Sequence, residues 1–470
     1  MNSYSTGREV VEALNGIVDL SAGQLKVLDE QRLRSEAIDR LVYSAVFGSD
    51  EVKQVARWII WEAGQQLGVM PASIQGLYEA RGRGEVGGYT VPAMNLRGLT
   101  YHMGRAAIRA ALQHNVGAFI FEIARSEMGY TEQKPEEYTT ALIAAGIREG
   151  WRGPLFVQGD HFQINRKGWD KDRAGQIDGL KKLIDEAVAG GFYNIDIDSS
   201  TTVDLSQPTV DTQQHSNYSA AAELTAHIRS REPDGVTISV GGEIGEVGGK
   251  NSTPEELEAY MNGYLQELKQ RGASLKRISK ISIQTGTEHG GVVLPDGSVA
   301  DVSLDFNVLK SLSHLARQKY GLAGAVQHGA STLPDSAFHK FVESDCCEVH
   351  LATAFQNMTF ESPSFPSNLL DEMYEFARVN FQDEKKEGQT DEQFIYKTRK
   401  KLYGPFKRQA WDMDSNTLAT LGREWEEKFA FYYQQLAVVN SRDMVDRYVK
   451  PVRIARPRPQ ALEEVTKLAR

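Results

Sequence analysis

Cysteine is almost absent from this sequence. Among 470 residues there are two, Cys346 and Cys347, and they are neighbours. Adjacent cysteines cannot provide a framework of structural disulfides, and we do not expect a zinc site built on thiolates. The first residues also lack the charged-then-apolar order of a signal peptide. These absences predict a protein of the reducing cytoplasm.

Long apolar stretches and an excess of positive charge are missing as well. No apolar run approaches the roughly 20 residues that a membrane-spanning helix needs, so we expect no membrane partner. The formal net charge of −10 argues against a nucleic-acid-binding surface. With 41% hydrophobic and 25% charged residues, the composition is that of an ordinary globular protein. Its length allows one large barrel with extensions, or two to three domains.

The middle of the chain alternates between strand and helix patterns. Residues 1–84 show helical spacing of apolar residues, with helices expected over 8–18, 36–47, 51–67 and 72–80, and residues 361–470 are again charged and helical. Between them we expect eight buried strands, over 90–95, 118–124, 155–160, 192–198, 237–243, 280–286, 324–328 and 348–353. Eight strands separated by helices predict an α/β fold, a (β/α)8 TIM barrel over residues 85–360 with N-terminal and C-terminal helical extensions.

Three of the predicted strands end at a histidine. Asp160 and His161 follow the third strand, while His289 and His328 follow the sixth and seventh. In such barrels the chemistry lies at the carboxyl ends of the strands. Three imidazoles can hold zinc or a similar divalent cation and leave a position open for substrate. Alone, each histidine would be interpreted as a hydrogen-bonded structural residue, but their common place favours a metal site. Asp160 beside it could move a proton on a substrate polarised by the ion.

Glycines and hydroxyl groups follow the last strands. Gly290, Gly329 and Ser331 come directly after the sixth and seventh strands, and Thr353 ends the eighth. Loops after the last strands of a barrel frequently bind phosphate through backbone N–H groups. A single glycine turn is weak evidence, since glycine also serves tight turns, but the combination favours an anion site. Lys280 begins its strand instead of ending it, which lowers the case for a Schiff base.

Seven motifs resemble, in order and spacing, those of the class II, metal-dependent ketose-bisphosphate aldolases, which include fructose- and tagatose-bisphosphate aldolases. They are Val91-Pro-Ala-Met-Asn95, Gly159-Asp-His161, Ile197-Asp-Ser-Ser200, Gly242-Glu-Ile-Gly-Glu-Val-Gly-Gly249, Gly286-Thr-Glu-His-Gly290, His328-Gly-Ala-Ser331 and Val349-His-Leu-Ala-Thr353. The resemblance implies that His161, His289 and His328 bind Zn2+, with cobalt or iron as alternatives, and that Asp160 is the catalytic acid/base. It also places Glu243 and Asp198 near the metal. Substrate or its phosphate would contact Gly290, Gly329, Ser331, Thr353, His350 and Asn95.

The resemblance implies reversible cleavage of a ketose bisphosphate, with fructose 1,6-bisphosphate expected, to dihydroxyacetone phosphate and glyceraldehyde 3-phosphate. Two features differ from the family pattern. Lys250-Asn251 stand where the family has acids after a Gly-Gly pair, with Glu246 as a substitute, and His350 stands where the family has Asn. His350 could contact substrate or form a wall of the site.

Two alternatives to the aldolase stay open. One is a metal-dependent sugar-phosphate 4-epimerase, which breaks the same bond and re-adds the aldehyde on its other face. The second is a non-catalytic barrel subunit of a tagatose-bisphosphate aldolase. We interpret the helical extensions as packing or oligomer contacts and expect a homo-oligomer.

Overall fold

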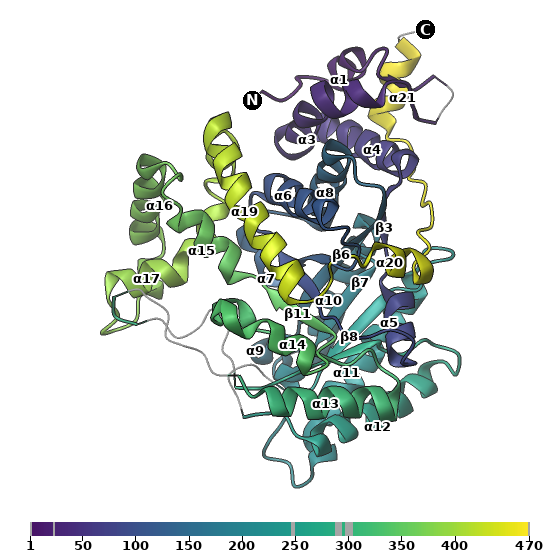
Figure 1. Cartoon of the computed structure of the whole chain (residues 1–470), viewed down its shortest axis with the longest axis vertical. Helices are drawn as coiled ribbons and strands as arrows, with labels where there is room; N and C mark the ends of the chain where they lie inside the picture. Colours follow the sequence, from purple (N-terminus) through teal and green to yellow (C-terminus); the bar gives the residue numbers. More distant parts are fainter. Residues whose placement is uncertain (1, 22–23, 246–249, 287–293, 297–303, 469–470) are drawn as a thin grey trace.

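A closed barrel of parallel strands forms the centre of the molecule, and helices from both ends of the chain pack against it (Figure 1). The computed structural model describes residues 2–21, 24–245, 250–286, 294–296 and 304–468. Within these residues the barrel strands are β4 (Val91–Asn95), β5 (Ile120–Ala124), β6 (Gly153–Gln163), β7 (Asn194–Asp198), β8 (Ser239–Glu243), β9 (Lys280–Ile283), β10 (Ala325–Gln327) and β11 (Glu348–Leu351). Each pairs in parallel with the next, and β11 closes onto β4. The predicted TIM barrel is confirmed.

The barrel strands are buried on both faces, which explains their continuous apolar character. Every residue of β4, β5, β7 and β8 is buried. The covering helices are α6 (Thr100–Gln113), α7 (Arg125–Tyr130), α8 (Pro135–Glu149), α9 (Arg166–Trp169), α10 (Arg173–Gly190), α11 (Val210–Arg231), α12 (Pro254–Arg271), α13 (Phe306–Tyr320), α14 (His339–Glu343) and α15 (Thr353–Glu361).

Local sequence signals set the ends of these helices. Pro254 opens α12, where the side chain of Thr253 accepts a hydrogen bond from the backbone N–H of Glu256 in a capping box. Gly150 ends α8 in the left-handed conformation, with φ of 76°. Such signals explain why most helix positions can be read from the sequence.

The helix predicted over residues 72–80 begins later than expected. Residues Val69–Ala72 form a strand, β3, parallel to β6, and helix α5 runs over Gln75–Gly82. The side chain of Asn194 at the start of β7 donates hydrogen bonds to the carbonyl oxygens of Ala72 and Val157 and accepts one from the N–H of Ile74. These long-range hydrogen bonds override the local helical spacing.

The chain ends meet on one side of the barrel (Figure 1). The N-terminal elements are α1 (Gly7–Ala13), β1 (Val18–Asp19), β2 (Lys26–Val27), α2 (Glu30–Arg32), a π-helix (Leu33–Ala37), α3 (Ile38–Phe47) and α4 (Asp50–Leu67). The C-terminal elements are α16 (Ser367–Asn380), α17 (Asp391–Thr398), a 3-10 helix (Arg399–Tyr403), α18 (Lys407–Trp411), α19 (Ser415–Gln435), α20 (Arg442–Tyr448) and α21 (Gln460–Leu468). Helices α3 and α4 pack on α8, α19 packs along α6, and α21 contacts α1 and α4.

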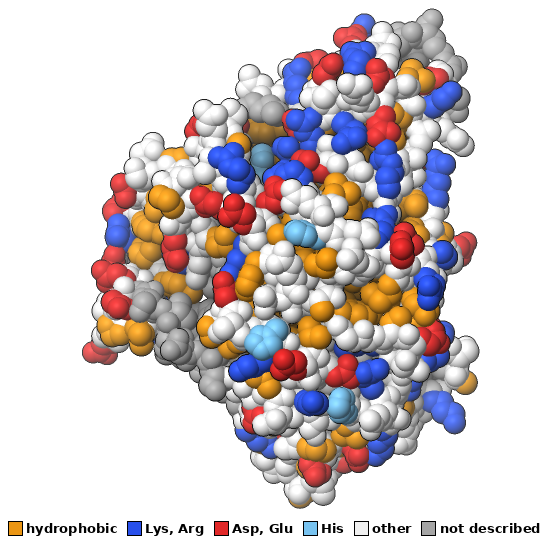
Figure 2. Space-filling model, viewed as in Figure 1, with side chains coloured by type: hydrophobic (Ala, Val, Ile, Leu, Met, Phe, Trp, Pro, Cys, Tyr) orange, Lys and Arg blue, Asp and Glu red, His pale blue; other side chains and the backbone are white. Residues whose placement is uncertain are grey.

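The surface carries charges of both signs. On the face shown in Figure 2, acidic and basic side chains of the described residues lie interspersed. Across the described part of the chain, no helix has the length and apolar character needed to cross a bilayer.

Candidate active site

An irregularity in β6 turns two neighbouring side chains toward one cavity. The pairing of β6 with β7 shifts between Gly159 and Phe162, and His161 adopts a positive φ of 42°. Successive residues of a regular strand point to opposite faces, and a bulge re-aims them. Gly159 is needed here, because a Cβ on it would lie 2.4 Å from the Phe162 ring. Asp160 and His161 therefore both line the cavity at the carboxyl ends of the strands.

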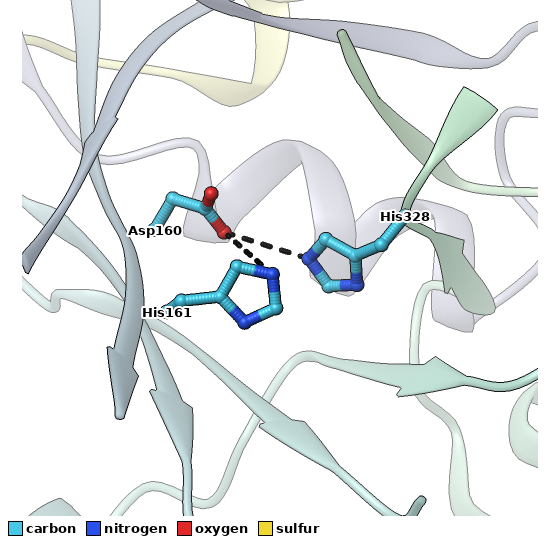
Figure 3. Close-up of side chains that lie close together, drawn as sticks. All are labelled: Asp160, His161 and His328. Atoms are coloured by element: carbon cyan, nitrogen blue, oxygen red, sulfur yellow. Dashed lines mark ion pairs between the residues drawn. The ribbon is translucent and has the colours of Figure 1, made fainter. Parts of the chain in front are cut away.

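Asp160, His161 and His328 come together from β6 and the end of β10 (Figure 3). Asp160 Oδ1 lies 3.8 Å from His161 Nε2 and 3.5 Å from His328 Nε2. The two imidazole rings have centroids 4.2 Å apart. The structure thus brings together the predicted acid and two of the three predicted histidine ligands. His289 and Gly290 lie outside the described residues, as does Glu246.

The other face of His161 meets two carboxylates, those of Asp198 and Glu243. His161 Nδ1 is 3.0 Å from Asp198 Oδ2 and 3.5 Å from Glu243 Oε2. Asp198 is fixed by the N–H and hydroxyl of Ser200 and by Gln163 Nε2. The second oxygen of Glu243 is buried and has no hydrogen-bond partner among the described residues. Both predicted metal-proximal acids therefore lie at the site.

His350 lies at the inner end of the cavity. Its Nδ1 is 3.1 Å from Asp160 Oδ1 and 3.0 Å from Glu122 Oε2, and its Nε2 is 2.7 Å from Glu348 Oε1. Its ring centroid is 4.2 Å from that of His328. His350 therefore forms a wall of the site and holds the carboxylate of Asp160.

Beneath His350, a buried lysine balances the charges of the barrel interior. Lys280 Nζ donates to Asp196 Oδ2 at 2.9 Å, Gln158 Oε1 at 2.7 Å and Glu348 Oε1 at 2.5 Å. Sequence reasoning missed Glu122, Asp196, Glu348 and this role of Lys280. Their signal was a charged residue inside an otherwise apolar strand, because buried charges require partners.

The charges around the site shift the pKa values of its two strand-end histidines in opposite directions. Burial lowers the pKa of His328, and the positive charges of His350 and His161 lower it further. Burial opposes protonation of His161 too, yet Asp160 and Asp198 raise its pKa well above the ordinary range. His328 is therefore neutral at neutral pH and presents a lone pair.

The carboxylates also respond to burial and to the imidazoles. Burial by itself would raise the pKa of Asp160, but the charges of His161 and His350 hold it well below its usual range. Burial and the charge of Asp198 raise the pKa of Glu243. Burial is also the main reason that the pKa of Glu122 rises to about 7. Asp160 is therefore ionised at neutral pH.

The donor atoms around His161 fit a divalent metal ion. One atom each from Asp160, His161 and His328, and one each from His161, Asp198 and Glu243, lie within 4.8 Å of one another. Imidazole nitrogen with carboxylate oxygen is a common ligand set for zinc. The unpartnered buried oxygen of Glu243 fits a nearby cation as well. A third cluster, Asp196 with Glu348 and His350, is already neutralised by Lys280 and needs no ion.

The expected phosphate-binding residues line the same cavity, whose volume is about 850 Å³. Gly329 has φ of 70°, and the Ser331 hydroxyl accepts a hydrogen bond from the N–H of Ala352 just before Thr353 opens α15. Asn95 lies behind the cavity wall, where its amide bonds Glu127 and Arg97. The substrate contact of Asn95 stays a prediction.

Comparisons with known proteins agree with this geometry. The sequence profile of fructose-bisphosphate aldolase class-II proteins matches residues 79–407. Among curated proteins, none matches the sequence significantly.

Solved structures share the fold at low identity. The fructuronate-tagaturonate epimerase UxaE from Cohnella laeviribosi is 13% identical, with 84% of this chain and 86% of that chain covered and a TM-score of 0.50. The fructose-bisphosphate aldolase of Campylobacter jejuni is 16% identical, with 79% and 98% covered and a TM-score of 0.46. A probable tagatose 6 phosphate kinase from Sinorhizobium meliloti 1021 is 18% identical, with 81% and 98% covered and a TM-score of 0.49.

Proposed function

This chain belongs to the fructose-bisphosphate aldolase class II family, and from that premise we propose that it is a zinc-dependent aldolase. It cleaves a ketose bisphosphate reversibly to dihydroxyacetone phosphate and an aldehyde. Fructose 1,6-bisphosphate is the expected substrate, and glyceraldehyde 3-phosphate is then the aldehyde. The observation that carries the proposal is the meeting of Asp160, His161 and His328 at one mouth of the barrel.

The metal would be held by His161 and His328, with Glu243 within reach and His289 as the predicted third imidazole. A bound divalent cation polarises the ketose carbonyl and stabilises the negative charge that develops when the carbon–carbon bond breaks.

Asp160 acts on the other side of that bond. Its ionised carboxylate takes the proton of the C4 hydroxyl, C4 becomes the aldehyde carbon, and the electrons of the C3–C4 bond pass to the enediolate. A proton then returns to C3 to give dihydroxyacetone phosphate. His350, bonded to Asp160 at 3.1 Å, keeps the carboxylate ionised and oriented.

The phosphate next to the carbonyl binds at the ends of β10 and β11. Gly329, Ser331 and the N-terminus of α15 provide the turn, the hydroxyl and the backbone N–H groups. The first turn of α15 contains no acidic residue that would repel the anion.

A coupled assay for triose phosphates tests the proposal. Fructose and tagatose bisphosphates are supplied with and without a chelator, to the native protein and to Asp160→Ala. We expect cleavage that the chelator abolishes, and a loss of at least ~100-fold in the variant, the scale of a positioned proton-transfer group. Unchanged metal content and thermal unfolding of the variant are the controls. Native protein that releases no triose phosphate with zinc present contradicts the proposal.

One observation favours the 4-epimerase as a second candidate. Lys250 pairs with Glu256 at 2.9 Å, and Asn251 Nδ2 lies 3.5 Å from Asp305 Oδ2, so neither supplies the acid expected for protonation at C3. An epimerase needs no such acid, because the enediolate is recaptured by the aldehyde. Product analysis by NMR separates the two: triose phosphates indicate the aldolase, and a C4 epimer without them indicates the epimerase. Protein that binds no metal and stays inactive with zinc indicates the non-catalytic subunit.

A further inference from the structure

Three cations from two distant parts of the chain line the active-site cavity. They are Arg125 at the start of α7, Lys397 at the end of α17 and Lys400 in the 3-10 helix that follows. We propose that this cationic cluster (Arg125, Lys397 and Lys400) is a second anion subsite, which binds a charged group at the far end of the substrate. The proposal rests on the proposed function and makes the C-terminal extension part of the active site.

None of the three cations has an ion pair with a carboxylate among the described residues. Their neighbours do: Arg97 pairs with Glu127, Arg399 with Glu361 and Lys401 with Glu384. Arg125 donates Nη1 to the carbonyl oxygen of Gln163, and its other guanidinium nitrogens remain for a ligand. Cations that line a cavity without a counterion favour an anionic ligand there.

Burial and mutual repulsion make these charges costly without an anion. Burial lowers the pKa of Arg125. Burial and the charge of Arg97 lower the pKa of Lys400, whose ammonium lies 5.9 Å from the centroid of the Tyr130 ring. A bound phosphate or carboxylate would relieve both effects, since an opposite charge nearby favours the protonated form.

The cluster is held on packed elements. The 3-10 helix Arg399–Tyr403 contacts α7, and the Tyr403 ring packs on Phe360 with centroids 5.0 Å apart. Arg399 Nη2 donates to Asn357 of α15. These contacts tie the segment that carries Lys397 and Lys400 to two barrel loops, so that the subsite is formed before substrate binds.

The two anion subsites lie at different places on the barrel rim. Gly329 follows β10 and Thr353 follows β11, whereas Arg125 follows β5, with β4 between β11 and β5. A linear sugar with an anion at each end could therefore occupy both. The cavity of about 850 Å³ is within the usual range for small-molecule sites. The far anion would be a phosphate or a carboxylate, because guanidinium and ammonium groups bind either.

Equilibrium binding tests the proposal without catalysis. The probes are hexitol 1-phosphates, which have no carbonyl and cannot be cleaved, with a hydroxyl, a phosphate or a carboxylate at the far end. Calorimetry compares the wild type with Arg125→Gln, Lys397→Gln and Lys400→Gln. The matched control is Lys401→Gln, which removes the neighbouring lysine that pairs with Glu384.

We expect the wild type to bind a probe with a far anion at least ~10-fold more tightly than the hydroxyl probe, the scale of a hydrogen bond between charged groups. Arg125→Gln and Lys400→Gln should each lose ~10-fold for that probe and less than ~2-fold for the hydroxyl probe. Lys401→Gln should lose neither, and Lys400→Arg should retain the preference. Whether the phosphate or the carboxylate probe responds identifies the far group.

Equal binding of all three probes by the wild type would overturn the subsite. So would equal losses for all probes in the Arg125 and Lys400 variants. These outcomes are distinct from failure of the proposed function. If a far-anion preference is measured but no ketose is cleaved, the aldolase proposal fails and the subsite stands; if cleavage occurs without the preference, the subsite alone fails.

Discussion

Asp160, His328 and His161 show how single residues acquire different states in one cavity. His161 faces carboxylates on both sides, whereas His328 meets Asp160 and two other imidazoles. Burial therefore dominates for His328 and lowers its pKa, while negative charge dominates for His161 and raises its pKa. A metal ligand must present a deprotonated nitrogen, so zinc binding at His161 releases a proton.

His102, far from the cavity, gives a pH dependence of stability. Burial lowers its pKa from 6.5 to about 3, with a further contribution from Arg105, and its ring lies 5.2 Å from that of Trp411. Because the folded-state pKa lies below that of the unfolded chain, the unfolded chain takes up the proton first as pH falls. The stabilisation is complete well above pH 6.5 and is lost as pH falls toward 3.

We expect the free energy of unfolding to fall by up to about 2 kcal/mol from this residue between about pH 7.5 and pH 5. Urea unfolding of the wild type and of His102→Gln at both pH values measures the difference. The stability gap between the two proteins should shrink by that amount at the lower pH. An unchanged gap would show that His102 is accessible to protons in the folded protein.

The residues at the ends of strands could be predicted from the sequence, and those inside the barrel could not. Asp160, His161 and His328 follow apolar runs, which marks them as rim residues of a barrel. Glu122 and Glu348 stand within strands, and their partners His350 and Lys280 become evident only when β5, β9 and β11 surround one interior. Pairing across a closed barrel depends on three-dimensional neighbours, which one sequence does not display.

At the scale of elements, the start of α7 is held by a buried ion pair. Arg97 Nη2 lies 2.5 Å from Glu127 Oε1, and the second oxygen of Glu127 accepts the backbone N–H of Ala124 at the helix start. Both side chains are about nine-tenths buried, with 10% and 8% exposure. The pair fixes the loop that follows β4 to the helix that carries Arg125.

Arg97→Leu should therefore destabilise the protein by about 3–5 kcal/mol, because it leaves the Glu127 carboxylate buried without its partner. Chemical denaturation measures the change in the free energy of unfolding. The control is Arg83→Leu, which breaks the exposed pair with Glu85 and should change stability by less than about 1 kcal/mol. Similar effects of the two substitutions would contradict the assigned burial.

The strand β3 shows where element prediction fails. Its residues Val69–Ala72 follow a helix and precede another, and one turn of helical spacing would join them to the second. Their pairing with β6 and the hydrogen bonds from Asn194 come from residues more than 80 positions away. The eight barrel strands were predictable because burial on both faces leaves a continuous apolar run in each.

At the scale of the whole molecule, the C-terminal segment returns to the N-terminal helices. The indole N–H groups of Trp58 and Trp61 donate to the carbonyl oxygens of Arg456 and Ile454. The Arg456 guanidinium lies 3.5 Å from the centroid of the Trp61 ring. The predicted division into residues 1–84, 85–360 and 361–470 stays a prediction, as does the homo-oligomer.

Deletion of residues 450–470 should lower the free energy of unfolding by about 2–4 kcal/mol, since two indole hydrogen bonds of about 1 kcal/mol each and one cation–π contact are lost. Arg456→Ala should lose part of this. Differential scanning calorimetry provides the measurement, and zinc titration shows whether the metal site persists, as we expect. An unchanged unfolding temperature would mean that the segment does not stabilise the N-terminal helices.

The account depends above all on His161 and His328 sharing one metal ion beside Asp160. Anomalous diffraction at the zinc edge, from crystals of the full chain with zinc, tests this directly. We predict one strong peak about 2.0–2.1 Å from a nitrogen of each imidazole. The same map would show whether His289 is the third ligand. A peak at His350 and Glu348 instead, or no peak between His161 and His328, would contradict the account.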